Sequence, residues 1–110
     1  MLAAPVGLPS FTASFEGKGW DESPKANLIA RQLGLDFYNV PITSEVVDEY
    51  INIQPSIFHE PFADPAQIAS YQISNFAKKE GVSVLIGGDG ADELFCGYSR
   101  LKYANYLSFI

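Results

Sequence analysis

The chain has 110 residues, which is the length of one small domain. Hydrophobic residues make up 47% of it and charged residues 18%, and this balance excludes a wholly disordered chain. Seven Lys and Arg residues against thirteen Asp and Glu residues give a net charge of −6. Because nucleic-acid binding needs an excess of cations to neutralise phosphates, we expect no nucleic-acid partner.

Cysteine and histidine each occur once, as Cys96 and His59. This excludes an internal disulfide, a cysteine-rich zinc site and a site built from several histidines. No apolar run approaches the roughly 18 residues of a membrane span, and residues 1–5 lack the basic region and long apolar run of a signal peptide. We therefore expect no membrane partner and a cytoplasmic protein.

The first half of the chain predicts two strands separated by a helix. Residues 10–15 (SFTASF) are typical of a strand, and Ser23 with Pro24 marks a helix start, with Ser23 as the N-cap. Gly34 is a natural end for that helix. A second strand follows at residues 35–42 (LDFYNVPI), in which a proline at position 41 indicates an edge position.

Two longer helices and a third strand are predicted next. Thr43 or Ser44 is expected to cap a helix that closes at Pro55, and Asp64 to cap another that ends at Gly81. Residues 82–86 (VSVLI) are almost wholly apolar, as in a strand buried on both faces of a parallel sheet. With a further helix start near residues 94–95, the pattern predicts an α/β fold, a parallel sheet of about three strands with about four flanking helices.

The segment most informative about chemistry is residues 85–98 (LIGGDGADELFCGY), a glycine- and acid-rich loop after the third predicted strand. Glycines and free backbone N–H groups after a strand favour phosphate, whereas carboxylates repel it unless a cation lies between them. One interpretation is therefore a Mg²⁺–polyphosphate site. The alternative, which the spacing supports equally, is that Asp89 caps a helix while Asp92 and Glu93 complement its dipole.

Three other features have structural interpretations beside functional ones. His59 is either a base or a packed residue next to proline and phenylalanine, and the packed role is favoured. Cys96 is either a thiol activated by a helix start or a small hydrophobe, and the second role is favoured. The aromatic residues of the C-terminal stretch indicate packing or an interface: Tyr98, Tyr103, Tyr106 and Phe109.

Three motifs, in order and at matching spacing, give the chain a family resemblance. Residues 88–98 resemble the SGDGGDELFGGY segment of asparagine synthetases. Residues 11–24 (FTASFEGKGWDESP) are similar to the FSIGF…DES segment of that family, and residues 60–68 (EPFADPAQI) to its DEPFADSSQI segment. The resemblance covers most of the chain and does not separate asparagine synthetases from β-lactam synthetases, lasso-peptide cyclases or sugar amidotransferases.

The resemblance implies a fragment of an adenine nucleotide alpha-hydrolase-like, or ATP pyrophosphatase, fold. Such a domain uses ATP and Mg²⁺ to adenylate a carboxylate, and an amine then attacks the acyl-adenylate. By position, Asp89 matches the acidic residue beside the reacting carboxylate, and Asp92 matches the aspartate that holds Mg²⁺–pyrophosphate. Residues implied to border the nucleotide are Thr12, Ala13, Gly87 and Gly88.

The departures from the family pattern concern the phosphate site. The sequence contains no SGGxDS pyrophosphate loop, and Met1 is followed by Leu2 instead of the cysteine nucleophile of a glutaminase domain. Gly87 stands where the family usually has serine. We therefore expect residues 1–110 to form a single partial domain, with weak or no nucleotide binding and no synthetase activity alone. The alternatives are an enzyme half completed by another chain and a non-catalytic interaction module.

The resemblance also raises a question about the sheet. In the family, a central strand lies between the counterparts of residues 10–15 and residues 82–86. Without it, either the two strands pair directly or another chain covers the exposed edges. Because direct pairing requires the helices on both faces to move, a homodimer is the favoured expectation, with a complementary chain as the other way to cover the edges.

Overall fold

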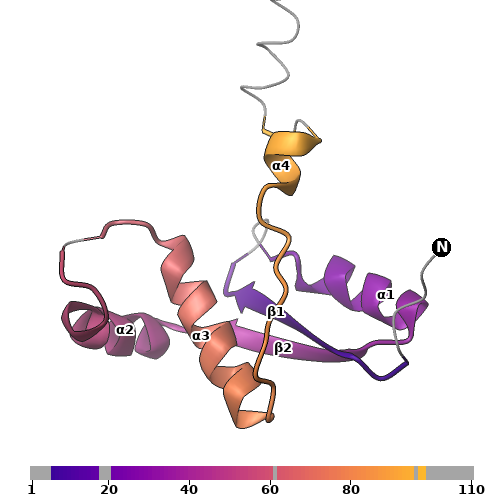
Figure 1. The fold of residues 1–110 in the computed structure, drawn as a ribbon, viewed down its shortest axis with the longest axis horizontal. Coiled ribbons are helices and arrows are strands. Elements are labelled where there is room, and N and C mark those ends of the chain that lie inside the picture. Colours follow the sequence, from indigo (N-terminus) through magenta and orange to yellow (C-terminus); the bar gives the residue numbers. More distant parts are fainter. Residues whose placement is uncertain (1–5, 18–20, 61, 96, 99–110) are drawn as a thin grey trace, which may run out of the picture.

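The computed structural model describes residues 6–17, 21–60, 62–95 and 97–98. Strands and helices alternate along the first half of the chain, and two further helices follow (Figure 1). The elements are β1 (Pro9–Phe15), α1 (Ser23–Leu33), β2 (Asp36–Ile42), α2 (Ser44–Ile57), α3 (Ala66–Lys79) and α4 (Ala91–Leu94). The α/β class predicted from the sequence is thereby confirmed.

The sheet of the described part has two strands, β1 and β2, which pair in parallel with Pro9 opposite Asp36 and Phe15 opposite Ile42. The backbone N–H of Asp36 donates to the carbonyl oxygen of Leu8 at 3.1 Å. Because alternate residues of a parallel strand bond to the same neighbour, the even-numbered residues of β1 face β2. The backbone groups of the odd-numbered residues therefore point to the open edge of β1.

Both prolines in the sheet occupy odd-numbered positions, Pro9 in β1 and Pro41 in β2. Their ring nitrogens, which cannot donate, therefore lie on the outer edges and leave the β1–β2 ladder complete. The edge position predicted for Pro41 is thus consistent with the register. Pro41 also lies near the C-terminal end of the outer edge of β2, where it hinders pairing with a further strand.

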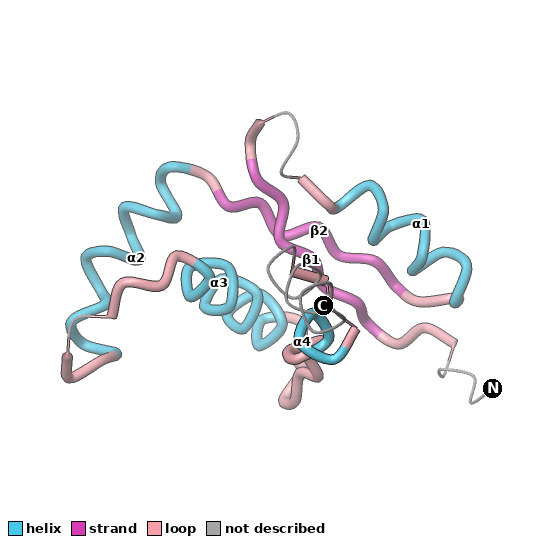
Figure 2. Tube along the Cα trace, turned by 90° about the horizontal axis from the view of Figure 1, so that it is seen from above, coloured by secondary structure: helices cyan, strands magenta, loops and turns pink. Residues whose placement is uncertain are grey.

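The helices form a layer on each side of the sheet, with α1 on one side and α2 and α3 on the other (Figure 2). On the α3 side, Phe11, Tyr38 and Phe76 pack together with ring centroids 5.2 to 6.1 Å apart. Val40 is fully buried on the same face of the sheet. This small aromatic and aliphatic cluster holds α3 against both strands.

The third predicted strand is wrong for the described structure. Residues 82–88 are irregular, and in Figure 1 they run across the two strands instead of alongside β1. Val84 and Ile86 are 77% and 97% exposed. Apolar, β-branched residues favour a strand only when a neighbouring strand supplies the ladder, and none lies beside this segment. Among the described residues, the direct pairing considered from the sequence is therefore not seen, and two strands form instead of about three.

The ends of α1, α2 and α3 agree with the sequence to within one or two residues, whereas the helix start predicted near residues 94–95 is wrong, because α4 begins at Ala91 and ends at Leu94. The N-cap of α1 is Glu22, one residue before the predicted Ser23, and Asp21 accepts hydrogen bonds from the Ser23 backbone and hydroxyl at 3.0 Å. Gly34 ends α1 with φ of 69°, as predicted. The prediction that Pro55 closes α2 is wrong, because the helix continues through the proline to Ile57.

Thr43 is the N-cap of α2, which confirms one of the two caps predicted from the sequence, Thr43 or Ser44. Its hydroxyl oxygen accepts from the backbone N–H of Val46 at 3.4 Å. A hydrogen bond with the Thr43 side chain is also the largest cause that lowers the pKa of the Glu45 carboxyl. Because this pKa is lowered by folding, the associated stability is present above the unfolded pKa and is lost as the pH falls through the folded one.

Replacing Thr43 with alanine should lower the free energy of unfolding by about 1 kcal/mol, the usual cost of losing a threonine cap. The same change should raise the pKa of Glu45 towards its ordinary value, because its main hydrogen-bonding partner is lost. Urea denaturation measures the first effect, and an NMR titration of the Glu45 carboxyl measures the second. Ser83→Ala, in the irregular segment, is the control. An unchanged Glu45 titration in Thr43→Ala would contradict the assigned contact.

Within the part of the chain that the structure describes, every helix is too short or too polar to cross a membrane.

Candidate functional site

The acidic loop ends in the single-turn helix α4, whose N-cap is Gly90 with φ of 85° and without a side-chain cap. Asp89 therefore does not cap this helix, and that part of the structural alternative is wrong. Asp92 and Glu93 do lie in the first turn, where they complement the helix dipole. Asp89, Asp92 and Glu93 are all exposed. The carboxylates are therefore available to a solute instead of being used in packing.

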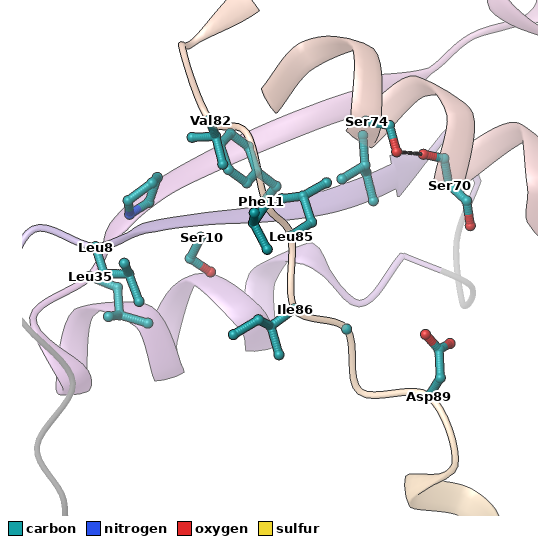
Figure 3. A pocket seen from close by; sticks show the side chains of 14 residues that line it. Leu8, Ser10, Phe11, Leu35, Ser70, Ser74, Val82, Leu85, Ile86 and Asp89 are labelled. Carbon is teal, nitrogen blue, oxygen red and sulfur yellow. Dashed lines mark hydrogen bonds between the residues drawn. The ribbon is translucent and has the colours of Figure 1, made fainter. Parts of the chain in front are cut away.

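A cavity of about 600 Å³ lies where residues 82–89 pass the first half of β1 and the side of α3. This volume is within the usual range of about 300–1,000 Å³ for a small-molecule pocket. Figure 3 shows the side chains around it, with Asp89 at the end of the segment farthest from Val82. The lining residues are Leu8, Pro9, Ser10, Phe11, Leu35, Ser70, Ile73, Ser74, Val82, Val84, Leu85, Ile86, Gly87 and Asp89.

The structure brings two of the predicted site residues to this cavity, Gly87 and Asp89. Gly88 follows directly in the same loop, outside the lining. Thr12 and Ala13 lie in the middle of β1, opposite Asn39 and Val40 of β2, and the cavity reaches only as far along β1 as Phe11. The backbone groups of Ala13 point to the open edge of β1, whereas those of Thr12 face β2.

Gly87 allows the carboxylate of Asp89 to fold back on the loop. A Cβ atom built at position 87 would lie 2.8 Å from Oδ2 of Asp89, closer than any side chain tolerates. Asp89 ends in a flexible, exposed carboxylate, so a larger residue at 87 would turn that carboxylate away at little cost. The serine that the family pattern carries at this position would therefore change where the acidic group points.

Asp92 lies against a second glycine. A Cβ atom at Gly97 would overlap Oδ1 of Asp92, and the backbone N–H of Gly97 donates to the carbonyl oxygen of Asp92 at 2.8 Å. Glycine at position 97 thus leaves room for the Asp92 carboxylate. Among the described residues, no three His, Cys, Asp or Glu side chains gather closely enough to hold a metal ion. One or two carboxylates suit Mg²⁺ only when substrate phosphates and water complete its ligands.

The sequence did not identify the contribution of α3. Ser70 and Ser74 line the cavity, and their hydroxyls donate to the carbonyl oxygens of Ala66 and Ser70. Their spacing of four residues places them on one stripe of the helix. That spacing was visible in the sequence, but only the fold shows that the stripe faces the acidic loop.

The other sequence candidates stand apart from this cavity. His59 is exposed and lines a separate cavity of about 320 Å³ with Gln54, Pro55, Phe58 and Glu60. Cys96 lies outside the described residues, as do Tyr103, Tyr106 and Phe109. Tyr98 is 40% exposed. The functional role of His59 therefore gains no support from a neighbouring site residue.

Comparison with known proteins agrees with the motifs. A family model described as "Asparagine synthase" matches residues 2–109. The chain therefore belongs to the asparagine synthase family. No solved structure gives a significant match.

The curated relatives are much longer than this chain. It is 41% identical over 95 residues to asparagine synthetase [glutamine-hydrolyzing] 1 of Bacillus subtilis, covering 84% of this chain and 14% of that protein. It is 33% identical over 103 residues to a putative asparagine synthetase of Methanocaldococcus jannaschii, covering 94% of this chain and 20% of that protein. The amidase chyE of Penicillium rubens is 29% identical over 109 residues, which are 96% of this chain and 16% of that protein.

Proposed function

We propose that residues 1–110 form one partial asparagine synthetase-like domain that contributes to ATP-dependent adenylation of a carboxylate and amide formation. Family membership implies ATP and Mg²⁺ as cofactors. The observation that carries the proposal is the cavity beside β1, into which the loop of Gly87 and Asp89 opens. On its own the chain is an inactive part of such an enzyme, and its proposed setting is the cytoplasm.

The chemistry of the loop supports these roles. Gly87 and Gly88 let the backbone approach a nucleotide, while the Ala13 backbone at the open edge of β1 offers N–H and C=O groups to an adenine ring. Thr12, whose backbone faces β2, retains only its side chain for that task. Asp92 is the proposed ligand of Mg²⁺, and Asp89 the acidic group beside the reacting carboxylate. When bound, Mg²⁺ screens phosphate charge from both carboxylates.

The proposed inactivity follows from how few phosphate-binding groups the sequence contains. Apart from the loop after residue 86, no glycine- and serine-rich loop is present to stabilise the charge that develops on phosphate. Incubation of the chain with ATP, Mg²⁺, aspartate and ammonia should give neither asparagine nor pyrophosphate above a no-protein control. Turnover clearly above that control would overturn the proposal.

Binding of Mg-ATP by the isolated chain should be millimolar or weaker and should require Mg²⁺, because a net charge of −6 repels the free nucleotide. Asp92→Asn should abolish any such binding. Glu80→Gln, at the end of α3, removes the same charge far from the loop and should leave it unchanged. Isothermal titration calorimetry measures all three proteins. Micromolar affinity without Mg²⁺ would count against the assignment of Asp92.

A complementary polypeptide that carries the SGGxDS loop is the second way to complete this site. The retained Gly88, Asp89 and Asp92 favour it, since a purely structural remnant does not require them. Addition of such a polypeptide should then restore pyrophosphate release. Co-purification of the chain as a lone homogeneous species speaks against this version.

A non-catalytic interaction module is the remaining candidate, and a specific observation favours it. The segment after α3 exposes a row of apolar side chains, among them Val84, Ile86 and Phe95, at 77%, 97% and 78%. Val84 and Ile86 line the cavity beside the first half of β1, and together with the open edge of that strand they offer a surface suited to another polypeptide. We propose a second copy of the chain as its partner, as a homodimer.

A further inference from the structure

A second cavity, of about 230 Å³, lies between α2 and α3. It shares Ser70 and Ser74 with the first cavity, whereas Gly87 and Asp89 line only the first. Tyr50, Ile57 and Phe58 line the second cavity from α2 and the residue that follows, and no charged side chain belongs to it. The α3 side carries Gln67, Ser70, Tyr71 and Ser74. An apolar cavity of about 150 Å³ is enough to bind benzene, so this one accommodates a single ring with a small substituent.

Gln67 supplies an unusual polar group at this cavity. The hydroxyl of Tyr50, a residue only 4% exposed, donates to Oε1 of Gln67 at 2.6 Å. The other amide atom, Nε2, is buried and has no hydrogen-bond partner among the residues that the structure describes. An unsatisfied buried donor costs about 1–3 kcal/mol. A rotation of the partly exposed Gln67 side chain towards the cavity relieves this cost when an acceptor is present there.

Several of the remaining polar atoms around the cavity are able to accept, and the hydroxyl of Tyr71 is able to donate or accept. Ser70 and Ser74 use their hydroxyl hydrogens on the carbonyl oxygens of Ala66 and Ser70, so that their own oxygens retain lone pairs. The Tyr50 oxygen is likewise able to accept. The Gln67 and Tyr71 donors and the several acceptors, beside aromatic rings, match the C=O and NH₂ groups of a primary carboxamide.

We propose that the cavity between α2 and α3 binds a small, uncharged carboxamide with a compact apolar body. Its carbonyl oxygen accepts from Gln67 Nε2, its NH₂ group donates to the serine oxygens, and its apolar body packs against Tyr50, Tyr71 and Phe58. The absence of a charged lining residue disfavours an anion or a cation of the same size.

Benzamide is the test compound, with toluene and benzoate as its matched controls. In ¹H–¹⁵N NMR spectra of the full chain, benzamide should shift the side-chain amide signal of Gln67 saturably, with a millimolar dissociation constant. Toluene lacks the acceptor and benzoate carries a charge, so both should bind about tenfold more weakly. Equal binding of toluene and benzamide would overturn the proposal. A Gln67 side-chain amide signal that does not shift when benzamide is added would also overturn it.

Variants separate the hydrogen bond from the shape of the cavity. Gln67→Met should weaken benzamide binding about tenfold, whereas Gln72→Met, on the same helix and outside the cavity lining, should leave it unchanged. Should Gln67→Met fail to fold, Gln67→Glu retains an acceptor for Tyr50 and removes the donor, and Gln72→Glu is then the control for the added charge. Unchanged benzamide affinity in the folded Gln67 variant contradicts the proposed contact.

Discussion

Replacing Phe76 with alanine is expected to lower the free energy of unfolding by about 3 kcal/mol. Phe76 is the residue of α3 that packs against both strands, with ring centroids 6.1 Å from Phe11 and 6.0 Å from Tyr38. Truncating it removes aromatic contacts and leaves a hole that two strands and one helix cannot readily close.

The loss of unfolding free energy expected for Phe76→Ala is large for a hydrophobic core of this size. Among the described residues, five hydrophobic side chains are buried: Ala30, Val40, Ile42, Tyr50 and Ala77. A chain of 110 residues commonly has a stability of about 5–15 kcal/mol, and a core this small points to the lower end. The loss of about 3 kcal/mol therefore removes a large part of the total.

Phe62→Ala is the matched control for Phe76→Ala. Phe62 stacks on Phe58 at 5.4 Å but is 46% exposed and belongs to the connection between α2 and α3. Its truncation should cost about 1 kcal/mol or less. Urea denaturation followed by far-UV circular dichroism measures both variants. Equal losses in the two variants would show that the contact between α3 and the sheet does not dominate the core.

The local signals in the sequence were sufficient for β1, β2 and the starts of α1, α2 and α3, because caps, prolines and glycines act over a few residues. Thr43 and Gly34 are examples in which one side chain or one backbone conformation decides the end of a helix. Residues 82–86 show where such reasoning stops. Their composition favours a strand, but pairing depends on a neighbour elsewhere in the chain, and the described structure holds none there.

The candidate site shows the same division. The residues of the loop with Gly87 and Asp89 left a Mg²⁺–polyphosphate site and a helix cap equally open, and the family pattern supplied the proposed role of Asp89. Both residues line a cavity. Thr12 and Ala13 were assigned through the family pattern, and the cavity does not extend to them. Ser70 and Gln67 were missed because their roles depend on which neighbour the polar stripe of α3 faces. That information resides in the packing of helices and is not contained in a local motif.

If the interaction module is the right function, the chain should sediment at micromolar concentration as a dimer that pairs through the open edge of β1. Such pairing would occupy the Ala13 backbone groups that the first proposal offers to adenine. The backbone groups of Phe11, Ala13 and Phe15 point to this edge, whereas the outer edge of β2 is interrupted by Pro41. A two-fold axis would place β1 antiparallel to its copy and extend the sheet to four strands. Unpaired N–H and C=O groups at the β1 edge would then be satisfied.

Two proline substitutions test which edge is used, because proline removes a donor only on the side to which its nitrogen points. Ala13→Pro removes an N–H from the open edge of β1, leaves the even-numbered ladder to β2 complete, and should give a monomer. Asn39→Pro makes the same change on the outer edge of β2 and should leave the dimer intact. Sedimentation velocity distinguishes the outcomes, with circular dichroism to confirm folding. A monomeric unsubstituted chain would refute association through β1, and a dimer that persists in folded Ala13→Pro would move the interface to another surface.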